Sequence, residues 1–141
     1  MTLYDDDFVR WTQQQAAFFR SMPASEGLDI EHLVDEIEGL GRSAIADLSS
    51  AIRHLLTRLV NRSVDPSSVS IEDIYSAQSE AIISADAGVW RHVDLDQVWR
   101  LVKRSTDVEL YDRCPIAIDQ LLAVDFDEHR AVALIVAGPA R

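Results

Sequence analysis

Residues 29–60 read DIEHLVDEIEGLGRSAIADLSSAIRHLLTRLV. Apolar side chains advance through this stretch in steps of three or four, at Ile30, Leu33, Ile37, Leu40, Ala44, Leu48, Ile52, Leu55 and Leu59. That spacing predicts one amphipathic helix, about 50 Å long at about 1.5 Å per residue, which ends in the segment 61–68. So long a helix would overhang a compact domain of this size. We therefore expect it either to bend at Gly39-Leu40-Gly41 or to protrude and pack on a partner, and the two glycines favour a bend or a close helix crossing.

The rest of the chain is expected to form shorter helices, separated by proline, glycine and serine. A first helix should begin at a cap formed by Asp5 and run to about Ser21. Its expected apolar face consists of Phe8, Trp11, Phe18, Phe19 and Met22. Further helices should occupy about residues 70–87, 95–108 and 115–122, since each segment begins with a capping residue or with a proline that suits the first helical position.

These segments predict an all-α fold, a helical bundle of about four or five helices around the long helix, in which a bend is allowed at the glycines. One domain should occupy residues 1–126, and a C-terminal tail should occupy 127–141. The apolar run 131–137 in that tail is compatible with a final helical turn, a strand added to a partner or a disordered end.

The composition narrows the class of protein. The chain has 141 residues, a formal net charge of −11 and 48% hydrophobic residues, which favours a folded domain over intrinsic disorder. A single cysteine excludes an internal disulfide. The acidic charge disfavours direct binding of nucleic acid, and no apolar run is long enough to cross a bilayer.

The compartment and source follow from two further features. The acidic start, Asp5-Asp6-Asp7, is unlike the basic start of a signal peptide, so we expect a cytoplasmic protein. Every basic residue except Lys103 is arginine, which indicates a GC-rich and therefore bacterial genome.

Two motifs near the ends of the chain resemble a known family. The chain is similar to the bacterial family known as domain of unknown function 29, over about residues 3–126. The resemblance is carried by Leu3–Phe8, Trp11, Gln15, Leu28–Ile30, Asp35–Ser43, Cys114-Pro115, Gln120–Leu122 and Asp125-Phe126. The middle departs from the family, since Pro66-Ser67-Ser68 stands where a more basic, tryptophan-bearing loop is usual. The resemblance implies an all-helical bundle and no activity.

Cys114 is the one thiol available for nucleophilic chemistry. A helix beginning at Pro115 would lower the pKa of that thiol, but no neighbouring base is evident in the sequence. A small buried apolar residue is the simpler interpretation. The four histidines show no metal-binding spacing, so we predict no metal and no cofactor.

Polar residues follow one flank of the long helix. Glu36, Asp47 and His54 project within about 20° of one another, with Arg58 nearby. Carboxylates beside a histidine allow an acid/base group or a buried network, whereas a solvated row at the boundary of the apolar stripe is the simpler interpretation. Glu38 and Arg42, four residues apart, should form an exposed ion pair.

Polar residues also interrupt the apolar stripes. Gln15 and Gln78 should act as hydrogen-bonding residues within the packing. The aromatic residues expected in the core are Trp11, Phe18, Phe19, Trp90 and Trp99. No catalytic residue is assigned. The candidate functional residues are Trp11, Gln15, Glu36, Arg42, Asp47, His54 and Cys114.

Three classes of function remain open from the sequence. We predict a helical interaction module that self-associates as a homo-oligomer, through the long helix or the tail, and binds another protein, with a basic partner favoured by the charge of −11. The first alternative is an acidic inhibitor that mimics nucleic acid or neutralises a basic toxin. The second is an enzyme that uses Cys114 or the Glu36/His54 flank.

Overall fold

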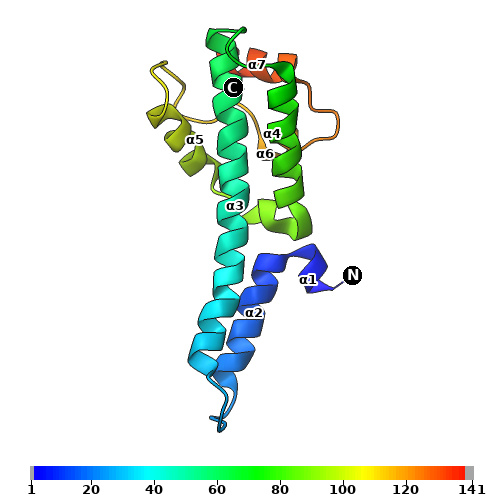
Figure 1. Ribbon diagram of the computed structural model, residues 1–141, viewed down its shortest axis with the longest axis vertical. Coiled ribbons are helices and arrows are strands. Elements are labelled where there is room, and N and C mark those ends of the chain that lie inside the picture. The colour runs from blue at the N-terminus through cyan, green and yellow to red at the C-terminus, as the bar shows by residue number, and fades with distance from the viewer. Residues whose placement is uncertain (1, 139–141) are drawn as a thin grey trace.

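Figure 1 shows the computed structural model, which describes residues 2–138. Within those residues the chain forms helices and no strand. The longer helices are α2 (Phe8–Ser21), α3 (Ile30–Val64), α4 (Ile71–Ser84), α5 (Leu95–Arg104) and α7 (Glu128–Ala137). The shorter ones are α1 (Leu3–Asp6), α6 (Ile118–Leu121) and the 3-10 segment η1 (Asp86–His92). The predicted all-α fold around one long helix is confirmed.

The long helix α3 runs without interruption through both of its glycines and spans about 52 Å for its 35 residues. Its first turn is capped by Asp29, whose side chain accepts a hydrogen bond from the His32 amide at 3.1 Å. Gly41 is buried where α3 meets α2, and a Cβ atom there would collide with the hydroxyl of Thr12. The helix therefore protrudes and does not bend. Gly41 allows α2 to cross α3 at close range.

The lower half of α3 pairs with α2 to form an antiparallel hairpin, joined at its tip by the exposed residues 22–29 (Figure 1). The residues of α2 that are buried against α3 are Val9, Thr12 and Ala16. The predicted apolar face of α2 is therefore wrong in part, because small and β-branched residues make the close contact. The larger residues, among them Trp11 and Phe18, lie beside this contact and are half-buried or exposed.

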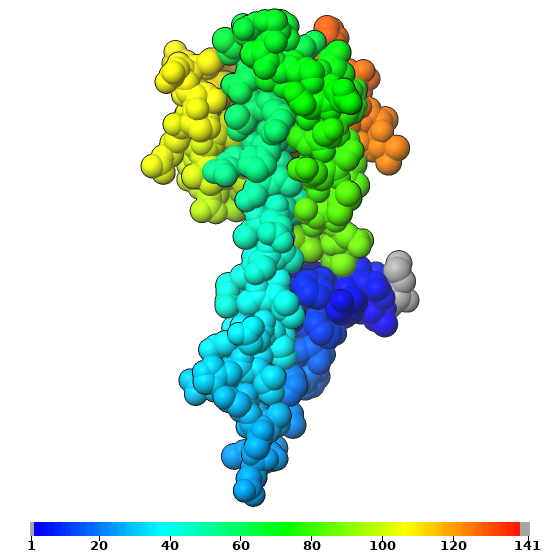
Figure 2. All heavy atoms as spheres, in the orientation of Figure 1, coloured from blue at the N-terminus to red at the C-terminus, as the bar shows by residue number. Residues whose placement is uncertain are grey.

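The upper half of α3 is the centre of the head, which we define as α4, η1, α5, α6 and α7 packed on residues 47–64 (Figures 1 and 2). Its hydrophobic core is formed by Leu48, Ile52, Leu55, Leu56, Leu59, Ile74, Val98, Trp99, Leu121 and Ile135, among others. Trp99 is fully buried and donates its indole N–H to the carbonyl of Tyr111 at 2.7 Å. Gln78 is buried as expected and donates to the carbonyls of Leu121 and Ala123.

Several expected boundaries and core assignments need correction. Asp5 lies within α1, and Asp7 is the residue that caps α2. The helix expected at 115–122 shrinks to α6, so Cys114 lies in an irregular segment and not at a helix start. Phe18 and Trp90 are 60% and 40% exposed, so the expectation that all the aromatic residues are core is wrong for them. The apolar run 131–137 belongs to α7, which buries Ala131 and Ile135.

Candidate protein-binding surface

Two rows of side chains on the hairpin form what we call the hairpin face. One row lies on α2 and the other on α3, and both have steps of four, three and four residues, as in a coiled-coil seam. The rows are Trp11, Gln15 and Phe18 on α2, continued by Met22 directly after its end, and Leu33, Ile37, Leu40 and Ala44 on α3. The hairpin face contains four large, solvent-exposed side chains, since Phe18, Leu40, Met22 and Leu33 are 60%, 54%, 45% and 36% exposed.

Both rows lie on the same side of the hairpin. At about 100° per residue, the α2 row is displaced from the buried contacts of its helix by roughly 120° and the α3 row by roughly 80°, in the same rotational sense. Because the helices are antiparallel, displacements of the same sense point to one side of the pair. At the upper end of the α2 row, the ring of Tyr4 meets that of Trp11 edge-on, with 4.9 Å between the centroids. The face is therefore bounded above by α1.

Higher on α3, the same stripe is covered by α4. Ala51 continues the α3 row and is 8% exposed, because the last turn of α4 lies alongside it. A shallow hollow of about 330 Å³ marks this place, lined by Asp47, Ser50, Ala51, His54, Glu80, Ile83 and Ser84. Since α4 ends at Ser84, the stripe is covered above Asp47, whereas below it Leu33 and Leu40 are exposed and Ile37 and Ala44 are half-buried.

Carboxylates border the α3 side of the hairpin face, and we call them the acidic edge. Glu36 and Asp47 are exposed, and Glu80 of α4 joins Asp47 at the hollow. None of the three forms an ion pair with a residue in the described part of the chain. The predicted row of Glu36, Asp47 and His54 is thus solvated along the helix.

This row is too extended to act as one acid/base group. Glu36 and His54 are 18 residues apart on one unbroken helix, which separates their backbones by about 27 Å. His54 is exposed, and the guanidinium of Arg58 donates to its backbone carbonyl at 3.3 Å. Asp47 and His54 both line the hollow beside α4, whereas Glu36 lies farther down α3, away from it.

Arg42 lies on the opposite side of α3 from the row. Its guanidinium is 3.8 Å from Glu38, which confirms the expected i, i+4 pair, and Glu38 also forms an ion pair with Arg20 of α2. These contacts join the two helices of the hairpin. Arg42 and Arg20 thus stabilise the hairpin from the side opposite the hairpin face.

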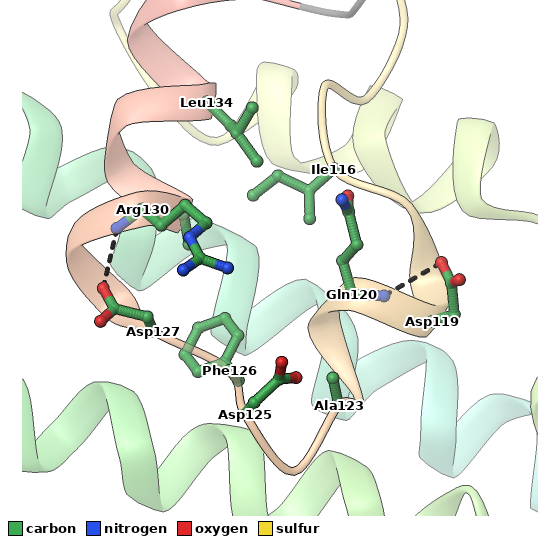
Figure 3. Close-up of a pocket in the computed structure, with 10 residues that line it drawn as sticks. Ile116, Asp119, Gln120, Ala123, Asp125, Phe126, Asp127, Arg130 and Leu134 are labelled. Carbon is green, nitrogen blue, oxygen red and sulfur yellow. Dashed lines mark hydrogen bonds between the residues drawn. The ribbon is translucent and has the colours of Figure 1, made fainter.

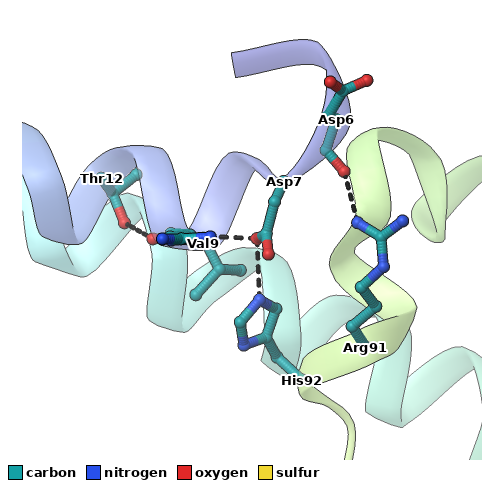
Figure 4. A network of polar contacts seen from close by, with 7 residues as sticks. Asp6, Asp7, Val9, Thr12, Arg91 and His92 are labelled. Atoms are coloured by element: carbon teal, nitrogen blue, oxygen red, sulfur yellow. Dashed lines mark hydrogen bonds and ion pairs between the residues drawn. The ribbon is translucent and has the colours of Figure 1, made fainter. Parts of the chain in front are cut away.

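Polar contacts join the hairpin to the head (Figure 4). This joint was not predicted from the sequence. Asp7 accepts a hydrogen bond from the Arg10 amide at 3.0 Å, and its carboxylate lies 2.7 Å from Nε2 of His92. Arg91 donates to the backbone carbonyl of Asp6 at 2.7 Å. Because 85 residues separate these partners, no local signal in the sequence pairs them.

The electrostatics of this joint favour an ionised Asp7. Burial by itself would raise the pKa of Asp7, but the Arg10 amide, His92 and Arg91 outweigh it, so the pKa lies below the ordinary range. Gly88 completes the joint, since it has a φ of +73° and a Cβ atom there would overlap the carbonyl of Asp6. The joint fixes where α1 and α2 meet η1.

A small pocket lies between α6 and α7 (Figure 3). Its volume is about 280 Å³, and several of its polar groups are engaged in local structure. Gln120 accepts a hydrogen bond from the Ala117 amide at 3.1 Å, and Asp127 caps α7 by accepting from the Arg130 amide at 2.9 Å. Phe126 packs edge-on against Tyr75 at 5.8 Å between centroids. These contacts give Gln120 and Phe126 of the C-terminal motif a structural role.

Cys114 is poorly suited to nucleophilic chemistry. Burial raises the pKa of its thiol to about 11, despite the opposing effect of its hydrogen bond with the Ile116 carbonyl at 3.3 Å. The thiolate that attack requires is therefore scarce at neutral pH. Within residues 2–138, no three metal-ligating side chains of the His, Cys, Asp or Glu type are grouped to hold an ion. No helix in the same range is long and apolar enough to cross a membrane.

Comparison with known proteins places the fold and the family. A crystal structure at 1.45 Å of an alpha-helical protein of unknown function from Rhodospirillum rubrum ATCC 11170 superposes with a TM-score of 0.77. It shares 24% sequence identity, and the alignment covers 94% of this chain and 97% of that protein, so the fold is shared along nearly the whole length. No curated protein matches the sequence. The model of the family described as domain of unknown function DUF29 matches residues 3–127, and the chain therefore belongs to that family.

Proposed function

We propose that this chain is a helical interaction module that binds protein through the hairpin face. The proposal rests on one observation, which is that the apolar stripe of α3 is buried along its upper half and exposed along part of its lower half. Above Asp47, the apolar stripe is packed under α4, while below it Leu33 and Leu40 are exposed together with Phe18 and Met22 of α2. A contiguous apolar face on a well-formed helix pair is typical of an interaction surface.

Self-association through α3 is part of this proposal. Two copies that meet at the hairpin face would cover each other's exposed rows, as in a four-helix bundle. The tail is the weaker candidate for such contact, because Ala131 and Ile135 of α7 already pack on the head of the same chain.

Site-specific photo-crosslinking in cells of the native host tests the proposal. A photoreactive phenylalanine analogue is placed at Phe18 or Leu40, and a matched control places it at Ala46, which is exposed on the opposite side of α3. We expect discrete covalent adducts from the two positions on the hairpin face and none from Ala46. The mass of each adduct distinguishes a second copy from another protein.

Two results would contradict the proposal. One is the absence of any adduct from Phe18 and Leu40. The other is an equal yield from Ala46, which would indicate random encounters. Circular dichroism of each variant checks that the helices are retained.

A further inference from the structure

We infer that the hairpin face binds an amphipathic helix of a partner protein that carries basic residues along one edge. This inference rests on the proposed function and adds the chemistry of the partner. It is argued from the shape of the face, from the charges that border it, and from the way α4 covers the same stripe.

The shape of the face fits a helix. The two rows, ending in Met22 and Ala44, lie along neighbouring antiparallel helices, so together they offer a partner helix an elongated apolar strip. The α4 helix shows what packs on this stripe, since it covers the continuation of the α3 row at Ala51 with a face that includes Ala77 and Ala81. The uncovered part, from Leu33 to Ala44, accommodates about three helical turns.

The charges beside the face differ between its two sides. On the α3 side the border is the acidic edge, with Glu36 and Asp47 exposed and unpaired among the described residues. On the α2 side the bordering residues are Gln14 and Ser21, which carry no charge, and Arg10 lies on the same flank one turn before Gln14, at its upper end. A complementary helix therefore has lysine or arginine along one edge and uncharged polar residues along the other.

A second copy of the chain complements these charges less well. Of the two basic residues of α2, Arg20 is paired with Glu38 on the far side of the hairpin, and Arg10 lies alone at the upper end of the α2 flank. Hairpin paired with hairpin would therefore place the acidic edge against a flank with a single arginine or against a second acidic edge, whereas a basic helix offers a row of cations. The net charge of −11 on each copy adds to the repulsion, whereas it attracts a basic helix. The basic helix therefore displaces self-association.

Two synthetic peptides test the inference with the purified full-length chain. Each is a helix of about 18 residues with leucine at the seam positions of its heptads, glutamine along one edge and either lysine or glutamate along the other. Fluorescence anisotropy measures binding. We expect the lysine peptide to bind at least about tenfold more tightly than the glutamate peptide at low salt, with the preference narrowing at high salt.

Matched variants separate the acidic edge from the overall charge. E36Q/D47N should reduce the preference for the lysine peptide to about threefold or less. E31Q/D35N removes the same number of charges from the opposite side of α3 and should leave the preference unchanged. Phe18→Ser should weaken the binding of both peptides.

The possible failures are distinguishable from failure of the proposed function. Equal binding of the two peptides, or equal effects of the two double variants, overturns the inference about charge while the apolar face remains a binding surface. If neither peptide binds but adducts still form from Phe18 in cells, the inference alone is overturned. If neither peptide binds and no adducts form, both the inference and the proposed function are wrong.

Discussion

Asp7 performs two tasks with one side chain. Its carboxylate caps α2 and contacts His92 of η1, so a residue at the start of the hairpin also anchors the head. Asparagine at this position would keep the cap but lose the negative charge, whereas alanine would lose both. Comparing the two variants therefore separates the contribution of the cap to stability from the contribution of the charge.

We predict that Asp7→Ala lowers the free energy of unfolding by about 1–2 kcal/mol and that Asp7→Asn lowers it by less. Since the pKa of Asp7 is lowered in the folded state, the contribution of its charge is present at neutral pH and is lost as pH falls below about 4. Urea denaturation at several pH values should therefore show the gap between the native chain and Asp7→Asn shrinking in acid. A gap that is constant with pH would contradict this assignment.

Gly88 is the second residue on which the joint depends. We predict that Gly88→Ala lowers the free energy of unfolding by about 2–3 kcal/mol, because it combines a positive φ with overlap of the Asp6 carbonyl. Gly27→Ala is the matched control, since Gly27 also has a positive φ but nothing lies within 4 Å of its Cβ position. Thermal unfolding should show the larger loss for Gly88→Ala, and equal losses would contradict the close contact.

At the scale of elements, the hairpin and the head differ in how far their apolar residues are buried. Phe18 on the hairpin face is 60% exposed, whereas Leu48 near the head is fully buried. The hairpin folds with small residues in its contact, Ala16 and Gly41 among them, and leaves its larger apolar residues outside. The face proposed for binding is therefore different from the face that stabilises the hairpin.

We predict that Phe18→Ser changes the free energy of unfolding by less than about 0.5 kcal/mol, because the side chain contributes little to packing within one chain. Leu48→Ala should cost about 2–5 kcal/mol through the cavity that it leaves in a fully buried site. Urea denaturation of the two variants gives the comparison. A large loss for Phe18→Ser would mean that the hairpin face is part of the folding core.

The sequence predicted the elements well because their signals are local. Steps of three and four residues locate α3, and capping residues such as Asp29 and Ser70 locate the starts of α3 and α4. The same periodicity cannot say which of two apolar faces is buried when a helix has both, as α2 does. The choice depends on close approach at Gly41, which only the packed structure reveals.

The candidate surface was predictable only in fragments. Seven candidate residues were singled out from the sequence. Trp11, Gln15, Glu36 and Asp47 lie on or beside the hairpin face, whereas Arg42, His54 and Cys114 do not. What the sequence could not supply is where α4 ends, because the boundary between covered and uncovered stripe depends on tertiary packing. Contacts over long separations, such as Asp7 with His92, were out of reach for the same reason.

At the scale of the whole molecule, an elongated hairpin projects from a compact head (Figure 2). We predict concentration-dependent self-association, seen by light scattering as a mass that rises above that of the monomer over about a hundredfold range of concentration. Leu40→Glu should abolish the rise, since it adds charge to the hairpin face, and Ala46→Glu on the opposite side should not. A constant monomer mass would argue against self-association.

The unbroken helix α3 also constrains how such a protein can change in length. The tip, residues 22–29, is exposed, and the contact at Thr12 and Gly41 fixes the level at which α2 meets α3. Insertions near the tip would preserve both faces of the hairpin only if they came in matched steps of about seven residues in each helix. The length of the hairpin can therefore change only in discrete steps. We expect relatives with longer or shorter hairpins to differ by whole heptads in each helix, while their heads superpose.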